Sequence, residues 1–449
     1  MVPDSTRPHG SRSSTPRPRA ITVHPRVGVE RTATRALWAT VSPLHIVIGM
    51  IGGGVLWMAA GPVNDIDSYW HVMIGRQLLA TRSLDRLGTQ WLGAAAPPWH
   101  TSEWLSEVGM AELVSAGGWR ALIVARLVTV TVLLALVALV LLHQTRPPVR
   151  VVAFGCVAVG IVSVAQDRPQ TLSLVFIALL SHACARLLRQ GRRPAWPLVA
   201  GFALLWAQLH ALWVLAPAAF LLAAVAVAAQ DGLRHPTVRA ALVCAVAALA
   251  GVVNPLGPSS LLLPLHFHDA TAMISEWGPT TLSDPFTIAW GLLLLATFTA
   301  WARSAERIPR GEVLWVLSWT AFGLVAFRDV VPALLLTVPL MAGAAERTWG
   351  PRLDRLSRPS GRLEARALRA ATVVAAGIGI IAAGLQVAET DPLRQTPALH
   401  IARALAQRPG VTRVFNTYNT SGSLVAFGGG RLRLVIDGRA DLWGNAFIT

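Results

Sequence analysis

The sequence has little charge, no lysine and only three cysteines. Charged residues make up 14% of its 449 residues, whereas hydrophobic residues make up 53%. Apolar runs of about 17 to 25 residues recur along most of the chain, which excludes an ordinary soluble protein and indicates an integral membrane protein. Cys156, Cys184 and Cys244 lie inside apolar runs without C-x-x-C spacing. They therefore support neither a disulfide framework nor a zinc site.

The motifs of several enzyme classes are also missing from the sequence. It contains no G-x-x-x-x-G-K, no G-x-G-x-x-G opening a βαβ unit, no H-E-x-x-H and no G-x-S-x-G. These patterns mark phosphate-binding loops, dinucleotide sites, zinc proteases and serine hydrolases. Their absence disfavours nucleotide-driven transport and protease chemistry.

The distribution of arginine predicts the topology of the membrane part. Eleven helices are expected to cross the membrane, at 44–60, 119–143, 150–166, 171–188, 196–210, 212–229, 238–254, 286–302, 312–327, 330–346 and 369–387. Most arginines fall in the N-terminal tail and in alternate connections, and arginine-rich short loops favour the cytoplasmic side. We therefore expect a membrane protein with its N-terminus on the cytoplasmic side and its C-terminus on the outer side. Topology then explains most of the net charge of +16, and no nucleic-acid partner is expected.

Composition divides the chain into three parts. Residues 1–43 are rich in Arg, Pro, Ser and Thr and predict a disordered basic cytoplasmic tail. Residues 44–388 form the transmembrane domain. Residues 389–449 predict a small extracytoplasmic α/β domain, either minimal or truncated. Its expected elements are a helix near 398–408, strands at Val411–Phe415, Leu424–Phe427 and Leu432–Ile436, and a turn at 428–430.

The first outer loop, residues 62–118, holds the densest group of polar and aromatic residues. Two interfacial helices are expected in it, at Ser68–Ala80 and Trp99–Ala116. Ionisable groups beside an apolar slab are costly, so their gathering on one face favours a functional site. The candidate residues on this outer face are Asp65, Asp67, His71, Arg76, His100, Glu103, Glu107, Asp167, Arg168, His210, Glu276 and Arg328.

Each candidate has a chemical interpretation and a plainer one. The carboxylates of Asp65 and Asp67 can share a divalent cation, or divide base and metal roles between them. His71 and Arg76 can contact a phosphate, and the guanidinium fork of Arg168 or Arg328 suits phosphate. The plainer interpretations are helix capping, solvated loops, a packed histidine at His210 and an anionic lipid beside Arg328.

Several motifs in the same order resemble the GT-C superfamily of polyprenyl-phosphate-dependent glycosyltransferases. The closest likeness is to bacterial members of unassigned substrate, which implies a protein of the bacterial cytoplasmic membrane with its active face outside. The shared motifs are D-x-D-x-x-W-H at Asp65–His71, W-x-x-x-E-W-L at Trp99–Leu105, R-P-Q at Arg168–Gln170, N-P-x-G at Asn254–Gly257, Asn416-x-Tyr418 with Ser421-Gly422, and Ile436–Asp441. The resemblance covers roughly residues 45 to 449.

The resemblance implies an inverting transfer of a sugar from a polyprenyl-phosphate donor to an acceptor of unknown kind. It implies a first-loop carboxylate as base, with Asp65 the best match and Asp67 its rival. It also implies a divalent cation, Mg²⁺ or Mn²⁺, held by Asp65 and Asp167. Related enzymes carry two metal-binding acids where this chain has only Asp167, so metal dependence stays open.

Two other classes of function fit part of the pattern. A lipid or solute transporter would also gather polar groups, but near the middle of the membrane and at broken helices. A non-catalytic scaffold for envelope assembly would keep the fold without needing the acids. The position of nearly all the polar groups at one interface favours the enzyme.

Overall fold

The computed structural model describes residues 42–63, 65–84, 100–263, 275–353, 362–410 and 412–437. The expected tail at 1–43 lies almost wholly outside these residues. Asn64, Trp99 and the motif end at 438–441 lie outside them too. The disordered tail therefore stays a prediction.

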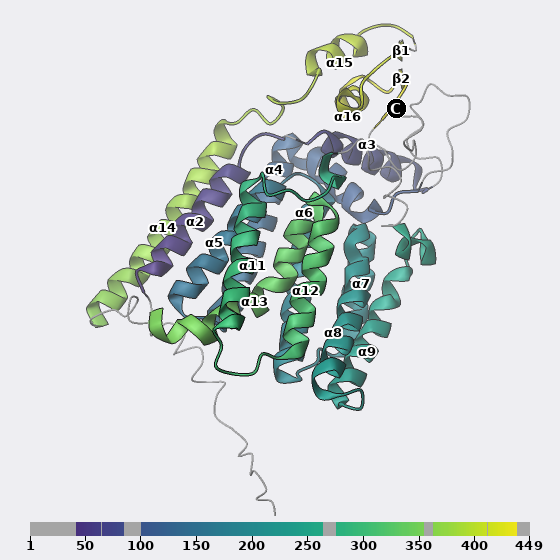
Figure 1. Ribbon diagram of the computed structural model, residues 1–449. Coiled ribbons are helices and arrows are strands. Elements are labelled where there is room, and N and C mark those ends of the chain that lie inside the picture. The colour runs from purple at the N-terminus through teal and green to yellow at the C-terminus, as the bar shows by residue number, and fades with distance from the viewer. Residues whose placement is uncertain are drawn as a thin grey trace, which may run out of the picture. The chain divides into compact units, whose positions relative to one another are not determined.

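The described chain is mostly α-helix, and helices occupy all eleven of the expected spans. The helices that lie side by side in Figure 1 are α2 (Leu44–Ala59), α4 (Trp104–Leu142), α5 (Pro147–Val164), α6 (Pro169–Gln190), α7 (Trp196–Leu209), α8 (Leu215–Asp231), α9 (Pro236–Ala248), α11 (Pro285–Ala302), α12 (Arg310–Val325), α13 (Val330–Leu353) and α14 (Arg362–Glu389). Five of them, α5, α6, α7, α9 and α11, carry proline at their first or second position. Proline is well suited there because a backbone N–H at the start of a helix has no acceptor within the helix, so its absence costs nothing.

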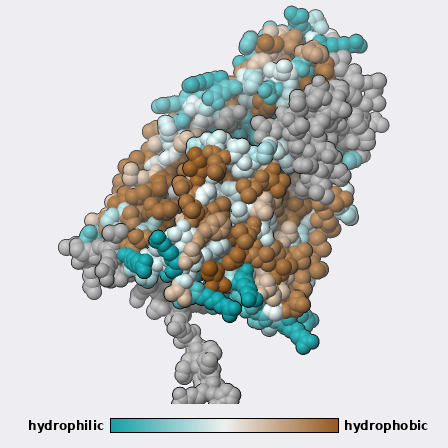
Figure 2. All heavy atoms as spheres, in the orientation of Figure 1, coloured by the Kyte–Doolittle hydropathy of each residue, from teal (hydrophilic) through white to brown (hydrophobic). Residues whose placement is uncertain are grey.

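Within the described ranges, seven helices are long and apolar enough to cross a membrane, and three more are apolar but shorter. The short ones are Leu44–Ala59, Trp196–Leu209 and Pro236–Val252. An apolar band covers the face of the helices shown in Figure 2, with hydrophilic residues at its edges. The chain is therefore a multi-pass membrane protein.

Two breaks in the helices lie beside the polar loops. Gly117 and Gly118 have non-helical backbone angles, with φ of 64° at Gly118, and divide α4 into an N-terminal segment and an apolar span. The N-terminal segment begins at Trp104, five residues later than the expected start at Trp99. His210 is extended and separates α7 from the 3₁₀ turn η1 (Ala211–Val214).

The short helix α3 (Ile66–Thr81) matches the first interfacial helix expected from the sequence, and glycines let its neighbours approach it closely. A Cβ atom on Gly75 would lie 1.9 Å from the carbonyl oxygen of Glu107, in α4. A Cβ atom on Gly422 would lie 2.2 Å from the carbonyl oxygen of Ile66. Only glycine fits at such contacts, so α3 is held between α4 and the C-terminal part.

The C-terminal part contains α15 (Leu399–Ala406), β1 (Thr412–Val414), α16 (Tyr418–Phe427) and β2 (Leu432–Leu434). The two strands pair in parallel, with Thr412 opposite Leu432 and Val414 opposite Leu434. The predicted strand at Leu424–Phe427 is wrong, because these residues end α16. A short apolar run fits a strand or a helix equally well. Here the run packs as a helix against α3, in contact with the apolar cluster of Trp70 and Ile74.

Candidate active site

Arg168 lies at the centre of three carboxylates from two separate segments. It immediately precedes α6, whereas Asp65 is the N-cap of α3 and Asp67 is in its first turn. Its Nη2 atom lies 3.0 Å from Asp67 Oδ2, its Nη1 atom 3.3 Å from Glu276 Oε2, and its Nε atom contacts Asp65 Oδ2. One guanidinium therefore joins the first outer loop to η5 (Ser275–Trp277).

The two first-loop aspartates differ in access to solvent. The side chain of Asp65 is 1% exposed and that of Asp67 is 23% exposed. Burial raises the pKa of Asp65, and the charge of Arg168 opposes that rise. Burial would lower the pKa of Arg168, but Asp67, Asp65 and Glu276 outweigh it and raise that pKa. Arg168 is thus a permanent cation that compensates the buried carboxylate.

Asp167, the residue before Arg168, is paired with a second arginine. Its Oδ2 atom lies 2.8 Å from Nη1 of Arg126, and both side chains are almost fully buried. Arg126 also donates to the carbonyl oxygen of Gly61, and Ser68 Oγ donates to the carbonyl oxygen of Asp167 at 2.9 Å. These contacts fix the loop that carries Arg168 against the start of the first outer loop.

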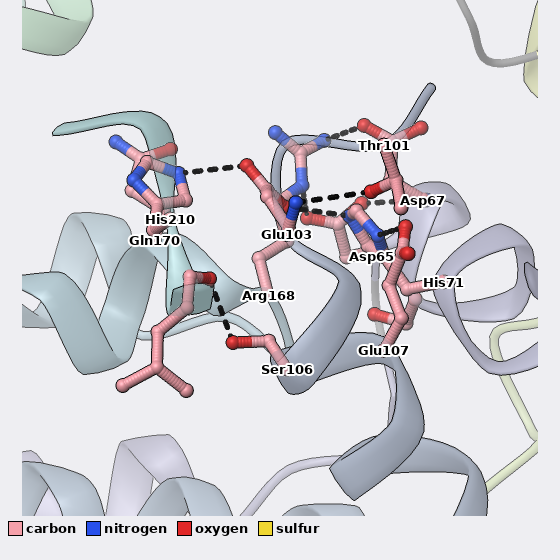
Figure 3. A network of polar contacts seen from close by, with 12 residues as sticks. Asp65, Asp67, His71, Thr101, Glu103, Ser106, Glu107, Arg168, Gln170 and His210 are labelled. Atoms are coloured by element: carbon pink, nitrogen blue, oxygen red, sulfur yellow. Dashed lines mark hydrogen bonds and ion pairs between the residues drawn. The ribbon is translucent and has the colours of Figure 1, made fainter. Parts of the chain in front are cut away.

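A second polar cluster, here called the Glu–His cluster, consists of His71, Glu103, Glu107 and His210 (Figure 3). His71 Nδ1 lies 3.2 Å from Glu107 Oε1, and His71 Nε2 lies 3.8 Å from Glu103 Oε2. On the other side of Glu103, His210 Nε2 lies 3.2 Å from its Oε1 atom. The side chains come from α3, from the start of α4 and from the break after α7.

Hydrogen bonding determines which form each histidine takes. His210 Nδ1 accepts from the backbone N–H of Leu212 at 3.1 Å, so its proton is on Nε2, which donates to Glu103. Burial and the nearby cations Arg328, His71 and Arg168 lower the pKa of His210 well below its usual value, so the ring is neutral. Burial would also lower the pKa of His71, but the hydrogen bond to Glu107 and the charges of Glu103, Glu107 and Asp67 raise it to about 9.

Two hydrogen bonds hold the start of α4 against the end of α7. Trp104 Nε1 donates to Gln208 Oε1 at 2.9 Å, and Ser106 Oγ donates to the carbonyl oxygen of Leu209 at 2.7 Å. Glu103 is the residue before Trp104, and His210 is the residue after Leu209. The contact between Glu103 and His210 is therefore set by the packing of two helices that are far apart in the sequence.

Arg328 lies beside these clusters with a different set of partners. Its guanidinium is 4.3 Å from the ring centroid of Trp277, and its Nη2 atom donates to Gln170 Oε1 at 3.2 Å. Among the described residues, no carboxylate lies within ion-pair distance of Arg328. It is therefore the arginine of this region best able to bind an anion.

The structure brings most of the predicted site residues together. Ten of them, Asp65, Asp67, His71, Glu103, Glu107, Asp167, Arg168, His210, Glu276 and Arg328, lie in or beside the two clusters. Two lie apart from them. Arg76 is exposed on α3, and the exposed His100 contacts only the carbonyl oxygen of Leu84 at 3.3 Å among the hydrogen bonds of the described residues.

The candidate residues chosen from the sequence left out three residues of this region: Arg126, Gln170 and Gln208. Arg126 carried a usable signal, because a charged residue inside an apolar span needs a partner. Gln170 belongs to the R-P-Q motif, but neither glutamine was given a role, since an amide at a helix end is ordinary.

The expected cation site does not fit the carboxylates as they lie. Arginines occupy the positions where a cation would bind, Arg168 at Asp65 and Arg126 at Asp167. Among the residues that the structure describes, no group of three or more His, Cys, Asp or Glu side chains could hold a metal ion. A cation shared by Asp65 and Asp167 would have to displace both arginines.

A mostly apolar cavity of about 210 Å³ begins beside Arg168. It lies between α4, the 166–172 segment and the end of α7. The residues that line it include Met110, Leu122, Asp167, Arg168, Leu172 and Leu209. The cavity thus joins charged groups of the site to apolar side chains of two membrane-spanning helices.

No family model matches this chain, and no curated protein matches it either. Its fold is similar to two structures of the Archaeoglobus fulgidus oligosaccharyltransferase, each at 11% sequence identity over 88% of this chain. One, tethered with an acceptor peptide containing the NVT sequon via a disulfide bond, has a TM-score of 0.53. The apo form has a TM-score of 0.49. The chain shares the overall fold of the peptide-tethered oligosaccharyltransferase. It spans 64% of the first structure and 65% of the second.

Proposed function

We propose that this protein is a membrane glycosyltransferase that moves a sugar from a lipid-phosphate donor to an acceptor at the outer face of the cytoplasmic membrane. The observation that carries the proposal is the position of the charged clusters. They lie at one end of a GT-C-type fold, beside an apolar cavity that reaches down between α4 and α6.

The chemistry of such a donor accounts for each part of this arrangement. A polyprenyl phosphate keeps its chain in the bilayer and its phosphate at the surface, so the enzyme must stabilise a leaving phosphate and activate an acceptor. Arg328 is the cation for the phosphate, because Arg168 is already surrounded by three carboxylates. The cavity beside Arg168 suits the first units of the lipid chain.

The carboxylates supply the acceptor side of the reaction. Asp67 and Glu103 are partly exposed, at 23% and 15%, and can contact an acceptor hydroxyl or amide. Asp65 is buried and acts through Arg168, which it holds in place. No step of this proposal requires a bound cation.

The test is a transfer assay with the full chain in lipid nanodiscs. The probes are polyprenyl-phosphate hexoses and pentoses with radiolabelled sugars, supplied with isolated envelope lipids and glycans as acceptors. We expect at least one donor to lose its label to an acceptor, and the variant Arg168→Gln to lose that transfer. An intact protein that binds polyprenyl phosphate but consumes none of the donors would support a scaffold instead.

A further inference from the structure

Asp65 is poorly placed to take a proton, although it best matches the family's base. Its Oδ1 atom accepts the backbone N–H of Asp67 at 2.9 Å, and its Oδ2 atom contacts Arg168 Nε. The side chain is 1% exposed. A carboxylate whose oxygens are both engaged, and whose side chain is almost fully buried, cannot reach an acceptor.

Glu103 differs from Asp65 in both access and partners. Its side chain is 15% exposed, and its two oxygens face the imidazoles of His210 and His71. Neutral His210 donates one hydrogen bond to the carboxylate, so that oxygen keeps a lone pair. Among the described residues, no arginine lies within ion-pair distance of Glu103.

The titratable and charged groups around Glu103 come from several elements. They are His71 on α3, Glu107 on α4, Arg168 before α6, the neutral His210 after α7, and Arg328 in η6 (Phe327–Asp329), while Asp67 on α3 acts on His71. Burial raises the pKa of Glu103 to about 7; His71 opposes that rise, Glu107 adds to it, and the two arginines oppose it. A base with a pKa near the working pH can both accept a proton and release it again.

We propose that Glu103 takes the proton from the acceptor, with His71 and His210 as positioning residues for its carboxylate. Asp65 and Asp67 then serve to hold Arg168. This inference rests on the proposed glycosyl transfer and names the base for that reaction.

The step balances without any further reactant. The acceptor oxygen or nitrogen forms a bond to the anomeric carbon while the bond from that carbon to the phosphate oxygen breaks. The electron pair of the broken bond leaves on the lipid phosphate, beside Arg328. The acceptor's proton passes to the carboxylate of Glu103, which releases it to the aqueous outer face before the next turnover.

The first test is the variant Glu103→Gln, compared in the transfer assay with Glu112→Gln. Glutamine keeps the acceptor for the His210 hydrogen bond but cannot take a proton. Glu112 is an exposed glutamate in the same N-terminal segment of α4, so it is a matched control. We expect kcat to fall about 100-fold or more in Glu103→Gln with a nearly unchanged KM for the donor. Glu112→Gln should stay within about twofold.

The pH profile separates a base from a merely structural residue. Activity in the wild type should rise with pH as Glu103 ionises, with a midpoint near its pKa of about 7. The positive charge of His71 favours the ionised form, so His71→Gln should move that midpoint to higher pH. A fall in kcat without any movement of the midpoint would overturn the positioning role of His71.

An infrared titration gives a readout that does not depend on turnover. The full chain labelled with ¹³C-glutamate is titrated from pH 5 to pH 9, and the spectrum of Glu103→Gln is subtracted. A glutamate band that changes near pH 7 supports the inference, whereas a Glu103 ionised throughout overturns it. Near-native transfer by Glu103→Gln overturns the inference but keeps the proposed function. A wild type that transfers no sugar from any donor overturns both.

Discussion

The carboxylate of Asp167 and the guanidinium of Arg126 lie 2.8 Å apart, with side chains that are 0% and 2% exposed. Arg126 belongs to the apolar span of α4, and Asp167 is adjacent to Arg168. The pair therefore connects the membrane-embedded helices to the loop that organises the first cluster. It gives Asp167 a structural partner within the chain.

Removing one member of this pair should be costly. Arg126→Gln leaves the buried Asp167 carboxylate without its partner, and we expect the free energy of unfolding to fall by about 3 to 5 kcal/mol. Adding Asp167→Asn to the same chain should restore part of the loss, because the uncompensated charge is gone. Chemical unfolding in mild detergent, followed by tryptophan fluorescence, measures the stability of the single and the double variant.

The control is the exposed Arg120 in the same helix, and Arg120→Gln should change the free energy of unfolding by about 0.5 kcal/mol or less. An equal effect of the two arginine variants would show that the buried pair has no special role.

Asp65 combines a charge role with a capping role, and two variants separate them. Asparagine is as good an N-cap as aspartate, so Asp65→Asn should keep α3 intact while removing a carboxylate from Arg168. We expect it to abolish transfer and leave folding and membrane insertion unchanged. Asp65→Ala also loses the cap, so its free energy of unfolding should be about 0.5 to 2 kcal/mol lower than that of Asp65→Asn. Transfer assays and unfolding curves of both variants give the comparison. Near-native activity in Asp65→Asn and in Asp67→Asn would contradict the role assigned to the first-loop pair.

Arg328 should determine donor affinity more than the rate of the chemical step. Arg328→Gln removes the cation beside Trp277, and we expect KM for a polyprenyl-phosphate sugar to rise about tenfold or more. Arg328→Lys keeps the charge but loses the planar fork, so its KM for the donor should lie between those of the wild type and Arg328→Gln. The matched control is Arg76→Gln, since Arg76 is an exposed arginine of α3 outside both clusters. Equal donor KM values in wild type and Arg328→Gln would remove Arg328 from the phosphate site.

Chelation should leave activity unchanged. The carboxylates expected to bind Mg²⁺ or Mn²⁺ are held by Arg168 and Arg126. We therefore expect transfer in excess EDTA to stay within about twofold of transfer with Mg²⁺ or Mn²⁺ added, since an essential cation would supply several kcal/mol of charge stabilisation. The check is the same assay after dialysis, with each cation restored in turn. Activity that disappears with EDTA and returns with one cation would show that a metal displaces an arginine during turnover.

Sequence patterns predicted the helices well because membrane spans are long apolar runs, and their ends were marked by proline, arginine and polar loops. Short elements were harder. The run Leu424–Phe427 looked like a strand, but its burial against α3 makes it the end of a helix. The number of helices that cross the membrane does not follow from the helices alone, since α2, α7 and α9 are short.

Most residues that gather in the candidate site could also be named from the sequence, because ionisable residues at the ends of apolar helices have few structural uses. Which of these residues contact one another could not be predicted. Nothing in the order of residues shows that Arg168 contacts Asp65, Asp67 and Glu276 together, or that Glu103 faces two histidines. These contacts depend on the close approach of α3 and α4 at Gly75 and on the hydrogen bonds between α4 and α7. These contacts are the reason that we propose Glu103, and not Asp65, as the base.

The Glu–His cluster should make the stability of the protein depend on pH. His71 has a folded pKa of about 9, above its usual 6.5, so its contribution is complete below pH 6.5 and is lost as pH rises through 9. Glu103 has a folded pKa of about 7, above its usual 4.5, so its contribution is complete below pH 4.5 and is lost as pH rises through 7. Both effects have the same sign, and we expect the unfolding temperature to fall as pH rises from about 4.5 to about 9.

Two histidine variants test whether His71 causes the fall in unfolding temperature with pH. His71→Gln should flatten the part of the curve above pH 7, because only His71 of the two groups still titrates there. His100→Gln is the control, since His100 is exposed and lies outside the cluster, and its curve should match the wild type. Thermal unfolding followed by intrinsic fluorescence at half-unit pH steps measures all three. A wild-type curve that stays flat between pH 7 and pH 9 would mean that His71 is not held as an imidazolium between Glu103 and Glu107.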